Sequence, residues 1–106
     1  MPSSFPFEAA GKAIRFDATA TAAAGDLGVE CEQVAIWNTG TVGVFIRFDK
    51  NSGGAAAVLP TVGTPQDGFM LKPDGWVALS IRGKRYFSAL TVGSTATLYL
   101  SPGIGG

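Results

Sequence analysis

Alternation of apolar and polar side chains is the main regular signal in this chain, and it recurs at short intervals. Ile14 and Phe16 alternate with polar or small neighbours, and Val34 and Ile36 repeat the pattern. A period of two residues is typical of a β-strand with one buried face. The predicted strands fall at residues 12–17, 32–38, 42–48, 69–71, 76–81, 86–92 and 95–100. No stretch shows a convincing helical period.

Turn-forming residues separate these runs. Thr39-Gly40, Pro73-Asp74-Gly75, Gly83-Lys84 and Gly93-Ser94 each stand between two apolar segments. Proline presets φ for a turn and glycine permits a reversal of the chain. Short strands with closely spaced turns indicate an all-β fold, namely an antiparallel β-sandwich or jelly roll of about seven to eight short strands.

The most apolar of these segments is IWNTGTVGVFIRF at residues 36–48. It predicts a hairpin in which Gly40 supplies the positive φ of a tight turn. One face would carry Val42, Val44, Ile46 and Phe48. The other face would expose Trp37, Phe45 and Arg47. Because a hairpin alone is marginal in water, the apolar face must pack on another sheet.

The chain divides into an extended N-terminal arm, residues 1–11, and a single β-sandwich domain, residues 12–106. The alanine-rich residues 18–25 favour an extended segment or a loop, with a short helix as the alternative. Residues 49–67 contain repeated Gly and Pro together with apolar side chains. We interpret them as an ordered excursion with one possible short edge strand.

Charge and composition exclude some classes of function. Charged residues make up 15% of the 106 residues and the formal net charge is zero. This content is below the roughly 25% typical of soluble domains, which favours a protein that works inside an assembly. A neutral chain is not expected to bind nucleic acid. No basic-then-apolar leader and no long apolar run is present, so we expect neither export nor a membrane.

The sequence contains few of the residue types that usually act in catalysis. The chain has no histidine, which removes the commonest general base and zinc ligand. Its one cysteine, Cys31, is expected to be a small buried apolar residue. Aspartates beside turns have an ordinary capping role. We therefore expect no enzyme activity, cofactor or metal. Trp37 and Trp76 could form a sugar-stacking platform, although aromatic residues on strands more often serve a core or an interface.

The segments QVAIWNTGTVGVFIRFD and YFSALTVGSTATLYLSPGIGG carry a family likeness. With the alanine-rich loop and Pro/Gly turn between them, they resemble small structural proteins of tailed-bacteriophage virions. These include capsid decoration, or cement, proteins with jelly-roll or sandwich folds. The resemblance covers roughly residues 32–106 and implies a virion role. The first 31 residues lie outside it.

The resemblance implies a cement protein made in the bacterial host cytoplasm and bound to the outer capsid surface. Its partners would be the major capsid protein and further copies of itself, as a dimer or trimer. The alternatives are a head–tail (neck) or tail-associated structural protein, and a carbohydrate-binding β-sandwich module. The expected protein-interface residues are Phe5 and Phe7 on the arm, Trp37, Phe45 and Arg47 on the hairpin, Val58, Leu59 and Val62 on the long loop, and Arg82, Lys84 and Arg85 at a basic turn.

Overall fold

The structure is a computed structural model that describes residues 7–9, 12–52 and 56–105. The described residues contain strands and loops but no helix, and so no helix that could span a membrane. The strands are β1 (Phe7–Ala9), β2 (Ile14–Ala18), β3 (Ala23–Asn38), β4 (Val44–Asp49), β5 (Phe69–Leu71), β6 (Trp76–Thr91) and β7 (Ala96–Gly105).

All strand pairs are antiparallel, and the strands form one hydrogen-bonded sheet in the order β1-β7-β3-β6-β4-β5. Strand β2 also pairs with β7. The predicted all-β antiparallel class is confirmed. Two strands, β3 and β6, are much longer than expected: each runs for 16 residues. Residues 7–9 of the predicted arm form β1, which pairs with the end of β7.

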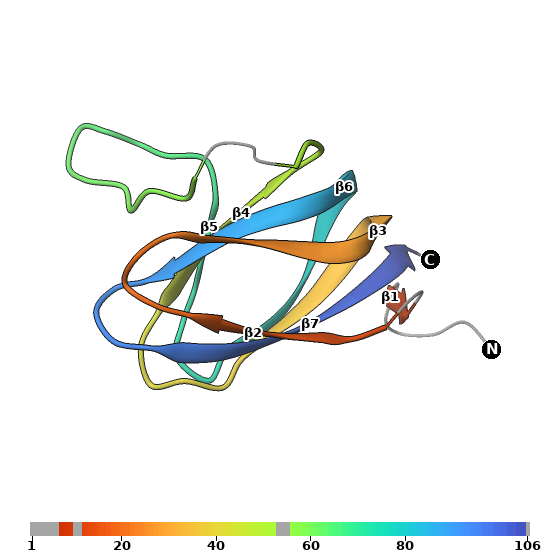
Figure 1. Cartoon of the computed structure of the whole chain (residues 1–106), viewed down its shortest axis with the longest axis horizontal. Coiled ribbons are helices and arrows are strands. Elements are labelled where there is room, and N and C mark those ends of the chain that lie inside the picture. The colour runs from red at the N-terminus through yellow and green to blue at the C-terminus, as the bar shows by residue number, and fades with distance from the viewer. Residues whose placement is uncertain (1–6, 10–11, 53–55, 106) are drawn as a thin grey trace.

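The two long strands bend and fold the sheet over on itself (Figure 1). The pairing of β3 with β6 shifts register around residues 26–33, where Gly28 has φ 86°. Opposite this point, Arg82 and Gly83 have φ of 53° and 79°. Left-handed residues at irregular pairs are typical of β-bulges, which bend a strand and increase its twist. The predicted turn at Gly83-Lys84 is therefore wrong, because β6 continues through a bend there.

The bends create two layers. The first layer contains β2, β7, residues 31–38 of β3 and residues 76–84 of β6. The second contains residues 23–26 of β3, residues 86–91 of β6, β4 and β5. This arrangement fits the sandwich alternative; a jelly roll is not established.

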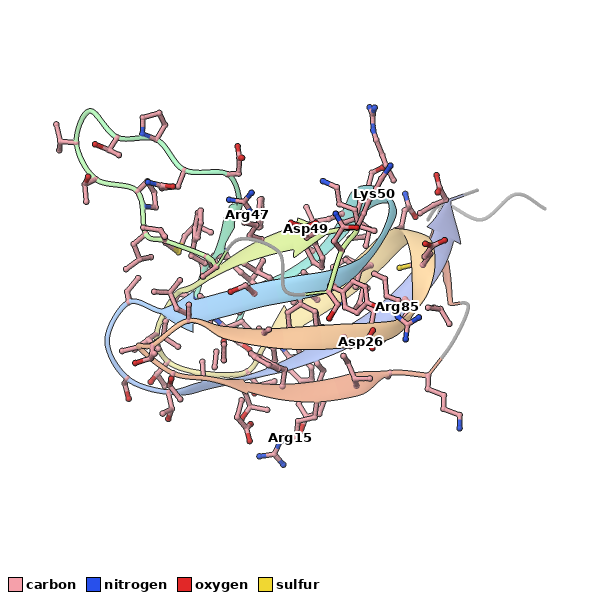
Figure 2. All side chains as sticks on the ribbon, turned by 45° about the horizontal axis from the view of Figure 1, so that its top comes forward. Arg15, Asp26, Arg47, Asp49, Lys50 and Arg85 are labelled. Atoms are coloured by element: carbon pink, nitrogen blue, oxygen red, sulfur yellow. The ribbon has the colours of Figure 1, made fainter. Side chains whose placement is uncertain are left out.

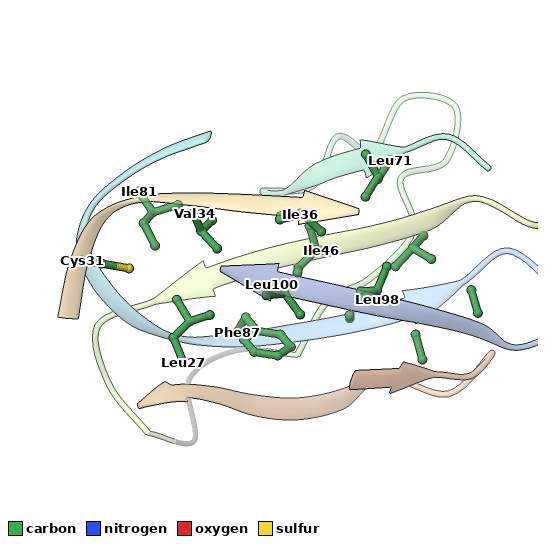
Figure 3. Packing of buried hydrophobic residues seen from close by; sticks show 14 residues of the cluster. Leu27, Cys31, Val34, Ile36, Ile46, Leu71, Ile81, Phe87, Leu98 and Leu100 are labelled. Atoms are coloured by element: carbon green, nitrogen blue, oxygen red, sulfur yellow. The ribbon is translucent and has the colours of Figure 1, made fainter. Parts of the chain in front are cut away.

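The core lies between the layers (Figure 3). Alternation places Val34 and Ile36 inward from the first layer and Val44 and Ile46 inward from the second. Phe16 and Phe87 meet edge to face across the core, with ring centroids 4.9 Å apart. Cys31 is buried, as expected. The further core members are Ala18, Leu27, Leu71, Ile81, Ala89, Ala96, Leu98 and Leu100.

Residues 36–48 do not form the expected hairpin. Strand β3 pairs with β6 and β7, whereas β4 pairs with β5 and β6. Residues 39–43 therefore connect one layer to the other. Gly40 does not have positive φ. A Cβ at Gly40 would lie 2.6 Å from the Ala96 Cβ, so close packing explains the glycine.

Asn38 holds this connection in place. Its side chain is fully buried, and its Nδ2 donates to the carbonyls of Val42 at 2.9 Å and Lys72 at 3.1 Å. Its Oδ1 accepts from the Gly40 N–H at 2.9 Å. One side chain thus ties the end of β3 to the start of β4 and to the predicted turn at residues 73–75. A buried amide of this kind needs such partners.

Candidate docking surface

Three aromatic side chains form a row on the outer face of the first layer. Trp37 is paired in register with Trp76 on β6 and with Tyr99 on β7. The exposed fractions are 56% for Trp76, 45% for Trp37 and 42% for Tyr99. The rings of Trp37 and Tyr99 have centroids 6.3 Å apart and are inclined by 38°. We call Trp76, Trp37 and Tyr99 the aromatic row.

The row stands beside small side chains. Alternation turns Val34 and Ile36 into the core and leaves Trp37 and Ala35 on the outer face. Ala35 pairs in register with Ala78 on β6 and Ser101 on β7, so the neighbouring row is small across the same three strands. The aromatic rings therefore have only small side chains beside them on this side of the row.

A hydrogen bond holds the middle ring of the row, and an ion pair lies beside its Tyr99 end. The Trp37 Nε1–H donates to Asp74 Oδ1 at 3.3 Å. At the Tyr99 end, Arg15 pairs in register with Tyr99 and its Nε lies 3.2 Å from Asp17 Oδ1. The Thr97 hydroxyl donates to the same Asp17 oxygen at 2.9 Å. The hydrogen bonds from Thr97 and then Arg15 lower the pKa of Asp17. The row thus ends in an ion pair exposed to solvent.

Phe45 is not part of this surface. It is 3% exposed and forms a second apolar cluster with Leu90 and Ala57, against which Leu59 packs. The Ala57 N–H donates to the Ser88 hydroxyl at 2.9 Å and anchors this part of the long loop on β6. The expectation that Trp37 and Phe45 share an exposed face is wrong, because the chain's own loop covers Phe45.

The other loop positions are more open. Val58 is 51% exposed, whereas Val62 is fully exposed near an isolated bridge between Thr61 and Thr64. Arg47 lies 3.8 Å from Asp67, and its side chain is 25% exposed. Phe5 lies outside the described residues. Phe7 is in β1, but its side chain lies outside the described part of the chain.

The expected basic turn is a corner of β6. Arg82 is exposed at the bend and Lys84 is half-buried. Arg85 instead forms a two-pronged ion pair with Asp26 on β3, at 2.8 and 3.1 Å (Figure 2). The Arg85 guanidinium also lies 5.2 Å from the centre of the Tyr86 ring. The Arg85 hydrogen bond, followed by the Gly28 N–H, lowers the pKa of Asp26. The three cations therefore do not form one free patch.

The described residues offer little for catalysis. A hollow of about 470 Å³ is lined by Asp26, Asp49 and Tyr86, among others. Asp26 is bound to Arg85, and Asp49 accepts the Asn51 N–H at 3.0 Å. Burial raises the pKa of the Cys31 thiol, which disfavours the reactive thiolate. No group of three potential metal ligands occurs in the described ranges.

The aromatic row was only partly visible in the sequence. Alternation placed Trp37 on an outer face, but it did not reveal that Trp76 and Tyr99 are its neighbours. Cross-strand pairs form between strands far apart in sequence, so only the strand order could identify them. Tyr99 was not singled out, because the pattern within its own strand shows only that it shares a face with Thr97.

No protein-family model matches the chain, and no curated protein matches it in sequence. One solved structure is similar, from a study of Bacillus endospore appendages described as a novel family of disulfide-linked pili. The TM-score is 0.48 and the sequence identity is 15%, over 97% of this chain and 93% of that one. A likeness at this level identifies neither a family nor a function.

Proposed function

We propose that this chain is a non-enzymatic structural protein of a tailed-phage virion that binds and stabilises the outer surface of the head shell. The observation that carries the proposal is the aromatic row, whose residues are 42–56% exposed on the outer face of the first layer. The sequence resemblance supplies the virion context. The major capsid protein is the proposed partner.

Protein contact is the use that best fits such a row. Tryptophan and tyrosine are enriched among the residues that dominate binding energy at protein interfaces. They bury a large area and lose little conformational freedom. The small residues beside the row, including Ala35 and Ala78, leave room for a partner to reach the rings. The low charge content of 15% adds little desolvation cost.

The absence of enzyme activity is part of the proposal. Without histidine, a nucleophile would need another base, and the two carboxylates that line the 470 Å³ hollow already have partners. Stabilisation by contact alone requires no reacting group. The mechanism is the burial of apolar surface between neighbouring shell subunits.

The first experiment measures the number of copies in purified particles by calibrated mass spectrometry. A shell protein is expected in a fixed, high ratio to the major capsid protein. A few copies per particle would instead indicate the head–tail or tail-associated alternative. Absence from particles would overturn a virion role.

A second experiment tests the surface itself. Particles lacking the protein are incubated with purified wild type, Trp37→Ser, Trp76→Ser or Val29→Ser, and the bound fraction is measured. We expect both tryptophan variants to bind at least tenfold more weakly, since a dominant aromatic contact is worth about 2 kcal/mol or more. Val29→Ser is the matched control, because Val29 is 40% exposed at the bend of β3 and belongs neither to the row nor to the expected interface residues. Equal binding by all four proteins would exclude the row as the docking site.

The same row supports one other candidate, a carbohydrate-binding module. Neighbouring strands lie about 4.8 Å apart, so three rings on three adjacent strands could stack on successive units of an extended glycan. A change in tryptophan fluorescence on adding a polysaccharide, abolished in Trp37→Ser, would favour this function. No change across a broad polysaccharide panel would dismiss it.

A further inference from the structure

The first half of β6 is an unpaired sheet edge. Residues 76–84 pair with β3 on one side, whereas β4 pairs only with residues 86–91. Within the described ranges, no strand or loop forms backbone hydrogen bonds to the other side of residues 76–80. We call residues 76–81 the open edge. Such an edge presents backbone donors and acceptors that can pair with another strand.

The hydrogen-bonding direction of each residue follows from one contact. The Asn38 N–H donates to the Gly75 carbonyl at 2.8 Å. Because hydrogen-bonded and non-hydrogen-bonded pairs alternate in an antiparallel ladder, Val77 and Leu79 direct their backbone groups toward β3. Trp76, Ala78 and Ser80 therefore direct theirs outward. Three residues with free backbone groups lie in a line.

The open edge lacks the features that normally prevent strand pairing. Its sequence, WVALSI, contains no charged residue and no proline. The opposite edge of the same layer, β2, carries the exposed pair Arg15 and Asp17. Charged side chains and prolines are the usual protection of exposed edges. The asymmetry between the two edges indicates that only one of them is available for pairing.

We propose that two copies of this chain pair through their open edges, antiparallel, with Ala78 on the two-fold axis. In this register Trp76 lies opposite Ser80 of the second copy, and Ala78 lies opposite its own equivalent. Trp76, Ala78 and Ser80 of one copy then form backbone hydrogen bonds with the same three residues of the second copy. The result is one continuous sheet across both copies.

Side chains on both faces fit this register. On the outer face, the large Trp76 meets the small Ser80. On the inner face, Val77 meets Leu79, and both are apolar and only half-buried in one copy. A groove of about 230 Å³ lies beside Leu79 and Ile81, bordered across the gap by Phe48 and Phe69. This groove gives the partner's apolar side chains a place to pack.

The charges at the ends of the edge agree with the same register. Continuing the pairing outward places Asp74 opposite Arg82 of the second copy. Asp74 lies in the exposed turn before β6 and Arg82 lies at its bend, and both are exposed. An acidic residue therefore lies opposite a basic residue at each end of the uncharged edge. A second copy supplies this complementarity without further assumption, and the pairing does not depend on what the aromatic row binds.

The test begins with sedimentation of wild type and Ala78→Lys over a range of concentrations. The buried area is small, so we expect a dimer that forms at the higher concentrations. Ala78→Lys places two ammonium groups side by side at the axis and should reduce association at least tenfold. Ala13→Lys is the matched control, since Ala13 is exposed beside the opposite edge. It should associate like wild type.

Mixing two variants of opposite charge at residue 78 gives the decisive measurement. Ala78→Asp alone should also remain monomeric, but an equimolar mixture with Ala78→Lys should form a heterodimer. A wild type that stays monomeric at every concentration would overturn the proposal. So would a dimer that is unaffected by Ala78→Lys, or one that is lost in Ala13→Lys.

Cysteine cross-linking tests the register independently of charge. Hydrogen-bonded antiparallel pairs have Cα atoms about 5.5 Å apart, within the range that a disulfide spans. Ala78→Cys should therefore cross-link to itself under mild oxidation. Ser80→Cys should not, because Ser80 faces Trp76 of the second copy. The native Cys31 is buried and does not compete. Cross-linking of Ser80→Cys in preference to Ala78→Cys would contradict the register.

Discussion

Trp37 and Phe45 are two aromatic residues on the outer faces of their strands, but they have different surroundings. Both point away from the core between the layers, as alternation requires. Trp37 remains 45% exposed in the first layer. Phe45, in the second layer, is 3% exposed because Ala57 and Leu59 from the long loop lie against it.

Two separate properties determine whether an outward-facing side chain is exposed. Alternation decides which face of a sheet a side chain occupies. It does not decide whether that face is later covered. In the second layer a loop anchored by Ala57 on Ser88 covers the outer face, and Phe45 becomes core. The first layer has no such cover among the described residues, so Trp37 remains available to a partner.

The largest expected effect is the difference in stability between the two sites. Phe45→Ala should lower the free energy of unfolding by about 3–5 kcal/mol, the usual cost of removing a buried phenylalanine. Trp37→Ala should cost about 1 kcal/mol or less, because an exposed site leaves no sealed cavity. Urea denaturation of both variants measures the difference. Similar losses in the two variants would contradict the contrast.

A smaller loss is expected at the connection between the layers. Asn38→Ala removes the side chain that bonds to the Val42 and Lys72 carbonyls, leaving buried acceptors unsatisfied. The expected cost is about 3 kcal/mol, from unsatisfied groups worth ~1–3 kcal/mol each. Thr39→Ala is the control, because its hydroxyl bonds to the Thr97 carbonyl at an exposed position. Denaturation midpoints that fall equally would show that the connection does not depend on Asn38.

Gly40 gives the next test, which asks whether close packing or backbone conformation requires a glycine. Gly40→Ala should destabilise by about 2 kcal/mol, within the ~1–3 kcal/mol typical of overpacking. Gly93→Ala should be close to neutral, because nothing lies within 4 Å of a Cβ there and its φ is not positive. Thermal unfolding of the two variants suffices. A neutral Gly40→Ala would mean that Ala96 can move aside.

The smallest effect concerns the ion pair between Asp26 and Arg85. The folded-state pKa of Asp26 is lowered, so its contribution is present above the unfolded carboxyl pKa, about 3.9, and is lost as the pH falls through the folded value. Wild type should thus exceed Asp26→Asn in stability at neutral pH, and the gap should close on acidification. Arg85→Gln should behave alike. A gap that is constant with pH would exclude the ion pair as its cause.

Several elements could be predicted from local sequence because their physics is local. Strands β2 and β4 and the first part of β7, residues 96–100, follow from alternation. Strand β5 follows from a short apolar run, and the turn at residues 73–75 follows from Pro-Asp-Gly. The inward positions of Val34 and Ile46 also follow from alternation. Predictions that depended on contacts between residues distant in sequence were wrong. The expected hairpin at residues 36–48 and the expected turn at Gly83 are both points where the chain passes between layers.

The sequence by itself determined that this protein is all-β and that Val34, Ile36 and Ile46 face the core, since these depend on period and side-chain chemistry within a few residues. Only the tertiary structure decided that Trp76, Trp37 and Tyr99 stand in one row, that Phe45 is covered, and that one half of β6 is left unpaired. The physical reason is that β-pairing joins residues distant in sequence. A strand pattern specifies what each strand needs to bury, but not which neighbour will bury it.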